Sequence, residues 1–272
     1  MKTKLFLPVV LCLIAAACST LAPDKPKPVA AKPTIRLTLL PQDTPKVGHP
    51  VMVLAKLERL QERTIVTADQ LETVHTQKFH LLLVDSTMTD YQHIHPQPTK
   101  TPGVYSFTFT PKVAGGYRAW ADITPVGGKE EFDMSEELGA HRAGAINKTE
   151  SHSANVGGYH FTLSFDKPPV EGGESMGTIM VTDHKNNPVM TLEPVMGAYA
   201  HIAGFYDDFR TVAHMHPMGA EPTGAHDRGG PELQFHFEPA RTGFVKFFAQ
   251  VQIAGKDMMV PFGVMVGKAS AK

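Results

Sequence analysis

Apolar and polar residues alternate over short runs along most of the chain beyond residue 33. Alternation with a period of two is typical of strands that bury one face. Glycine and proline between the runs favour turns, so the pattern predicts an all-β fold of β-sandwiches. Residues 130–143 are the best helix candidate, and we interpret them as a loop or short turn. The predicted strands are 35–40, 51–57, 79–84, 105–110, 117–123, 159–165, 176–182, 233–238, 244–251 and 260–266.

The pattern occurs twice along the chain. Each half has a histidine and, thirteen residues later, the sequence His-x-His-Pro. The histidines are His80, His93 and His95 in the first half, and His201, His214 and His216 in the second. The offset of 121 residues between the copies grows to 128 further on, which indicates an insertion within residues 218–231. We therefore predict tandem domains at 34–140 and 155–268, joined by a linker at 141–154.

The first residues of the chain are typical of an export signal. Lys2 and Lys4 precede an apolar run at 5–14 and three alanines, and Cys18 follows directly. This order resembles a bacterial lipobox, which implies removal of residues 1–17, diacylation of Cys18 and a Pro/Lys/Ala-rich tether at 18–33. A plain secreted protein is the alternative. The lipoprotein prediction places the chain in the bacterial cell envelope, anchored through lipid, on the periplasmic face of the outer membrane in a Gram-negative host.

The composition of the chain argues against some classes of function and draws attention to histidine. The 272 residues include 26 Lys+Arg and 27 Asp+Glu, a formal net charge of -1, which argues against a nucleic-acid binder. After removal of residues 1–17, Cys18 is the only cysteine, so no disulfide within the chain is expected. Fourteen histidines make histidine unusually abundant.

The histidine triads have a spacing suited to metal binding. Residues two apart in a strand point to one face, so His93 and His95 can present both rings together. A fold-back between His80 and this pair would complete three imidazoles, and the same holds for the second copy. Three neutral imidazoles suit copper, zinc or nickel. The alternative is a network of structural histidines. A duplication copies structural histidines as readily as metal ligands, so the repeat alone does not separate the two interpretations.

Other residues are candidate partners of the metal ligands. Asp122 and Gln250 occupy matching positions in the two copies and can orient an imidazole. Met218 and His236 are candidates for a fourth ligand or a supporting contact. We interpret the remaining histidines without a repeat partner as surface or loop residues, namely His49, His75, His160 and His184.

The His-x-His-Pro runs and the strands that follow resemble secreted bacterial YtkA-like and FixH-like domains, found among copper- and heavy-metal-handling genes. The resemblance covers residues 80–122 and 201–267. It implies an immunoglobulin-like or cupredoxin-like sandwich and metal handling in the periplasm. A blue-copper site would need a cysteine ligand, which the mature domains lack.

We therefore predict a lipid-anchored envelope protein that binds a transition metal, with copper favoured over zinc, at one surface histidine cluster per domain. Its role would be storage, sensing or delivery to a periplasmic metal-trafficking partner. The first alternative is a structural or interaction module without metal. The second is a zinc-dependent hydrolase, although the sequence has no His-Glu-x-x-His or phosphate-loop motif.

Overall fold

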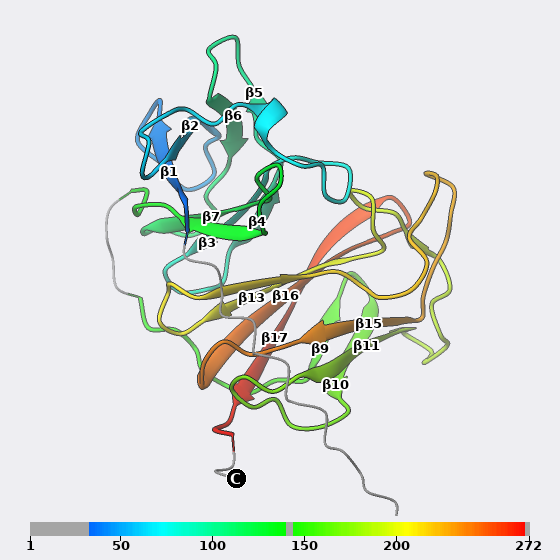
Figure 1. Cartoon of the computed structure of the whole chain (residues 1–272). Helices are drawn as coiled ribbons and strands as arrows, with labels where there is room; N and C mark the ends of the chain where they lie inside the picture. The colour runs from blue at the N-terminus through cyan, green and yellow to red at the C-terminus, as the bar shows by residue number, and fades with distance from the viewer. Residues whose placement is uncertain (1–32, 140–143, 270–272) are drawn as a thin grey trace, which may run out of the picture.

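The computed structural model describes residues 33–139 and 144–269. They form an all-β protein of four antiparallel sheets, arranged as two β-sandwiches (Figure 1), as the alternating pattern predicts. The predicted signal peptide, Cys18 and the predicted tether up to residue 32 lie outside the described residues. No helix in the described ranges has the length and apolar character needed to cross a membrane.

The first sandwich packs an outer sheet against an inner sheet. The outer order is β1 (Ile35–Pro41), β2 (Val51–Arg59), β6 (Val104–Phe109), β5 (Gln97–Pro98). The inner order is β4 (Tyr91–Ile94), β3 (His80–Asp85), β7 (Tyr117–Ile123), β8 (Glu131–Met134). Alternate residues of these strands, such as Val53, Leu81 and Phe107, form one apolar core between the two sheets.

The second sandwich repeats this plan. Its outer order is β15 (Glu232–Phe237), β11 (Ser175–Asp183), β10 (Tyr159–Phe165), β9 (Ser153–Val156). Its inner order is β12 (Leu192–Glu193), β16 (Gly243–Ile253), β13 (His201–Tyr206), β14 (Val212–Met215), and β17 (Lys256–Val266) also pairs with β16. Phe161, Phe235 and Phe247 are buried in the core between these sheets.

The two inner sheets face each other in the middle of the molecule, so the sheets stack in four layers (Figure 1). Every residue of β3 and of β13 is buried, which a strand achieves only when both of its faces are covered. Leu82 and Trp120 from the first domain share a third apolar core with Phe205 and Phe248 from the second. The domains therefore meet over a packed apolar interface.

Two parts of the structure differ from the sequence prediction. The helix candidate at 130–143, interpreted as a loop or turn, contains the strand β8, which pairs with β7. The short strands β4, β9 and β14 also fall outside the predicted ranges, because four residues are too few to show alternation. Helical structure in the described ranges is limited to one 3-10 turn, η1 (Ala68–Gln70).

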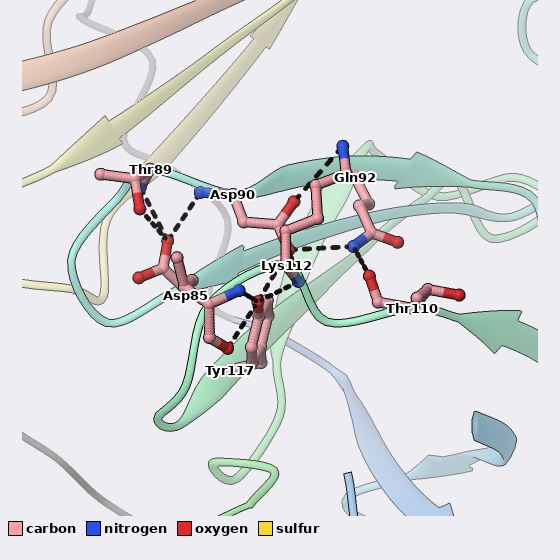
Figure 2. Close-up of polar contacts among 8 residues, drawn as sticks. Asp85, Thr89, Asp90, Gln92, Thr110, Lys112 and Tyr117 are labelled. Atoms are coloured by element: carbon pink, nitrogen blue, oxygen red, sulfur yellow. Dashed lines mark hydrogen bonds and ion pairs between the residues drawn. The ribbon is translucent and has the colours of Figure 1, made fainter. Parts of the chain in front are cut away.

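A polar network closes the hairpin between β3 and β4 (Figure 2). The Asp85 carboxylate accepts hydrogen bonds from the backbone N–H groups of Thr89 and Asp90, at 2.7 and 2.8 Å. The Tyr117 hydroxyl donates to Asp90 Oδ2 at 2.7 Å, which ties the turn to β7. These bonds hold the register in which Leu82 lies opposite His93.

Candidate metal centre

Strand geometry directs both histidine triads toward the domain interface. His80 begins β3, two and four residues before Leu82 and Val84, which face the second domain. Because residues two apart share a face, the His80 ring points the same way. His93 lies on β4 directly across from Leu82, so it also faces the interface. In the second domain His201 begins β13, and His214 lies across from Ala203.

The first triad is closely packed. His80 Nδ1 lies 3.2 Å from His93 Nε2 and 3.0 Å from His95 Nε2. The fold-back that the spacing requires is therefore present, as the β3–β4 hairpin.

The three rings of the second triad also lie close together. The ring centroid of His216 lies 4.8 Å from that of His201 and 4.6 Å from that of His214. The same hairpin connection, here between β13 and β14, brings the three residues together.

The two triads meet in one cluster between the domains. The ring centroid of His93 is 4.8 Å from that of His201 and 5.1 Å from that of His214. His80, His93 and His201 are only 3%, 9% and 0% exposed. The prediction of a separate surface cluster on each domain is therefore wrong, because both triads lie on the faces that the inner sheets turn toward each other.

Two groups in the cluster can hold a metal ion. They are His80, His93 and His95, and His93, His201 and His214, and within each group the ligand atoms lie within 4.8 Å of one another. His93 belongs to both groups, and the second group takes ligands from both domains. Imidazole nitrogens of this kind suit divalent first-row transition metals.

Backbone carbonyls orient the first histidine of each triad. His80 Nε2 lies 3.0 Å from the carbonyl oxygen of Val74, and His201 Nε2 lies 3.1 Å from that of Val195. A carbonyl oxygen only accepts, so each Nε2 carries the proton and donates it. The Nδ1 of each ring consequently keeps its lone pair, which faces the cluster.

Side chains from the opposite domain orient the second histidine of each triad. His214 Nδ1 donates to Asp122 Oδ2 at 2.6 Å, and His93 Nδ1 donates to Gln250 Oε1 at 3.2 Å. Asp122 is in the first domain and Gln250 in the second, so each contact crosses the interface. The Nε2 atoms of His93 and His214 are left with lone pairs that can bind a metal.

Several of these inward nitrogens are buried and have no hydrogen-bond partner. This is true of His201 Nδ1, His214 Nε2 and His216 Nε2. Buried polar atoms are almost always paired in folded proteins, and an unpaired one calls for an explanation such as a missing ion. Three such nitrogens in a single cluster are consistent with a metal site.

Burial keeps the imidazoles neutral. Desolvation lowers the pKa of His95 to about 4, of His214 to about 3 and of His201 to about 2. Neutral imidazole is the form that binds a metal. Burial also raises the pKa of Asp122 to about 6, and that of the neighbouring Glu130 to about 7.

Comparison with known proteins places the chain in a family. The model of a domain of unknown function, DUF8832, matches residues 32–135 and 154–268. The chain belongs to the DUF8832 family. The two matched DUF8832 segments each contain one histidine triad. No curated protein matches the chain.

Solved structures similar to this DUF8832 protein are distant. One is a Corynebacterium diphtheriae protein described as membrane anchored, with 8% identity and a TM-score of 0.25 over 86% of this chain and 59% of that one. Another is Escherichia coli alpha-2-macroglobulin activated by porcine elastase, with 12% identity and a TM-score of 0.24 over 86% of this chain and 20% of that one. This chain therefore spans less than two thirds of either protein.

One member of the cluster escaped the sequence prediction. His75, expected on the surface or in a loop, stacks on His216 with ring centroids 3.7 Å apart. Its Nδ1 lies 3.4 Å from Glu221 Oε1 at the edge of the site. The 121-residue offset between the DUF8832 copies pairs His75 with Met196, so a search for repeated histidines could not find it.

One predicted partner lies away from the cluster. His236 is on the solvent-facing side of β15, where its Nδ1 is 2.8 Å from Glu174 Oε1. Its neighbours Phe235 and Phe237 point into the core of the second domain, so alternation turns His236 away from the interface. Met218 is 48% exposed. The structure therefore does not bring His236 to the imidazoles, and a role for Met218 stays a prediction.

Proposed function

We propose that this protein binds a transition-metal ion, copper in preference to zinc, in the histidine cluster between its domains. The observation that carries the proposal is the direction of the ring nitrogens. Hydrogen bonds to Val74, Val195, Asp122 and Gln250 occupy the outer nitrogens of four rings. Four lone pairs are thereby turned into one buried cluster, which is unfavourable unless a cation or proton is shared among them.

The donor set favours copper on general grounds. Divalent copper forms the most stable complexes of the first-row series with nitrogen ligands, more stable than those of zinc. Because burial keeps the imidazoles neutral, protons compete weakly with the metal. The proposed role is storage, sensing or delivery of the metal, and not catalysis.

The proposed location is the bacterial cell envelope. The support is the order of charged, apolar and small residues before Cys18, which would carry lipid and attach the domains to a membrane. In that setting the natural partner is another envelope protein that supplies or receives the metal.

Equilibrium dialysis of residues 19–272 against Cu(II) and Zn(II) tests the proposal. We expect binding in the micromolar range or tighter, with copper bound more tightly than zinc. The His93→Ala and His214→Ala variants should each lose affinity at least tenfold. The control is His160→Ala, a half-buried histidine on β10, in the outer sheet of the second domain, that should leave metal binding unchanged. If the intact chain binds no metal more tightly than millimolar, it is instead a structural or interaction module.

A further inference from the structure

We infer that the cluster holds two metal ions side by side, one in each triad, as a dinuclear centre across the domain interface. The inference rests on the proposed function and adds the number and arrangement of the ions. It comes from the separate geometry of each triad and from the closeness of the two triads.

The first triad has nitrogen separations that fit one ion. The 3.0 and 3.2 Å distances from His80 Nδ1 to His95 Nε2 and to His93 Nε2 are close to a tetrahedral edge. That edge is about 3.3 Å for metal–nitrogen bonds of about 2.0–2.1 Å. His80 Nδ1 and His93 Nε2 both carry lone pairs, since their other nitrogens donate, so they repel each other without a cation between them.

The second triad offers the same three atoms. By the repeat, His80 Nδ1, His93 Nε2 and His95 Nε2 correspond to His201 Nδ1, His214 Nε2 and His216 Nε2. All three atoms of the second triad are buried and have no hydrogen-bond partner. The second triad therefore repeats the donor atoms of the first. In this structure the group of ligand atoms within 4.8 Å around His201 and His214 is completed by His93, so an ion in the second triad would draw the His216 ring inward.

Six imidazoles exceed what one four-coordinate ion needs. A zinc or copper ion commonly takes three or four protein ligands, so two ions use the six donors in full. The triads are close enough for the ions to be neighbours, since the His93 and His201 ring centroids are 4.8 Å apart and those of His80 and His214 are 5.7 Å apart. Two-metal sites place their ions about 3.5–4 Å apart.

A buried carboxylate offsets part of the repulsion between two cations. Asp122 is 6% exposed and contacts His214, and it supplies negative charge directly behind one ligand of the second ion. The matching position behind His93 is the neutral Gln250. The two ions should consequently bind with unequal affinity, the second-triad ion more tightly.

Copper titration with two readouts tests this inference on residues 19–272. Elemental analysis after dialysis should give two copper ions per chain. Electron paramagnetic resonance should show loss of the signal of isolated Cu(II), because neighbouring Cu(II) ions couple magnetically. His95→Ala and His216→Ala should each leave one ion with an uncoupled signal. Both residues are half-buried, so the variants should fold. His160→Ala is the control, and His95→Gln or His216→Gln replaces the corresponding alanine variant if its circular dichroism shows unfolding.

Other results overturn the inference in distinguishable ways. One ion per chain, lost in both variants, would mean a single shared site, which leaves the proposed function intact. Two ions with uncoupled spectra would mean that the sites are not neighbours. No binding would remove the proposed function as well.

Discussion

At the scale of single residues, the proposed metal centre depends on the groups that hold the imidazoles as well as on the imidazoles themselves. Asp122 and Gln250 each accept a hydrogen bond from a histidine of the opposite domain, but Asp122 is an acidic residue and Gln250 is neutral. A carboxylate behind a ligating imidazole raises its basicity and fixes its tautomer. The Asp122–His214 pair should therefore be the stronger half of the site.

Asp122→Asn should weaken metal binding at the second triad by about 10–100-fold, the usual effect of losing such a partner. Asparagine keeps an oxygen acceptor for His214 Nδ1 but removes the charge. Isothermal titration with Cu(II) measures the change. Asp133→Asn is the matched control, because Asp133 is equally buried at 2% exposed and lies on β8 opposite Ala121, which faces the core of the first domain. Equal losses in both variants would count against an orienting role.

The sequence predicts part of this residue-scale arrangement. The His-x-His spacing predicts that two rings share a face, because strand alternation is a local property. That His93 is oriented by Gln250, 157 residues away, depends on how the domains dock, which no local pattern encodes. His75 was missed for the same reason, since it reaches His216 only across the interface.

At the scale of elements, the alternating strands were predicted well and the inner strands only in part. Outer strands such as β15 alternate strictly between exposed and buried residues, so their two environments are visible in the sequence. The inner β3 carries the apolar run 81–84, which predicts a strand covered on both faces but does not identify the cover. The cover is the inner sheet of the second domain, which holds the triads together.

Trp120→Ala tests whether this sheet packing positions the site. Trp120 on β7 packs on Phe205, with ring centroids 5.4 Å apart, and its Nε1 donates to the Arg210 carbonyl at 2.8 Å. The truncation should lower the free energy of unfolding by about 3–5 kcal/mol and should weaken copper binding at least tenfold. Phe161→Ala, in the core of the second domain, should cost similar stability and leave copper binding unchanged. Urea unfolding and copper titration measure the two effects.

At the scale of the whole molecule, duplication and docking together make the site. The reciprocal contacts His93–Gln250 and His214–Asp122 relate the domains as an approximate two-fold interface would. One domain alone supplies three imidazoles and lacks the opposite domain's orienting side chain. Metal binding should therefore stabilise the docked chain as a unit.

The pH dependence of stability tests this picture of buried neutral imidazoles. Burial holds the pKa of His95, His214 and His201 near 4, 3 and 2, below the unfolded value of about 6.5. Between about pH 6.5 and 4 the unfolded chain binds more protons, so the free energy of unfolding of the metal-free protein should fall as the pH is lowered through this window. The slope reaches at most about 1.4 kcal/mol per pH unit for each such histidine.

Lowering the pH should affect copper binding in the buried cluster differently from copper binding at a surface histidine site. Because the folded imidazoles stay neutral down to about pH 5, protons do not compete with the metal there. The extra stability from saturating copper, about 2.7 kcal/mol at a hundred times the dissociation constant, should stay constant from pH 7 to pH 5 and begin to fall only near pH 4, where His95 titrates. Urea unfolding with and without copper at pH 7, 6 and 5 gives this difference directly. A loss that begins at pH 6.5 would mean that the ligands titrate as exposed histidines and that the metal does not bind in the buried cluster.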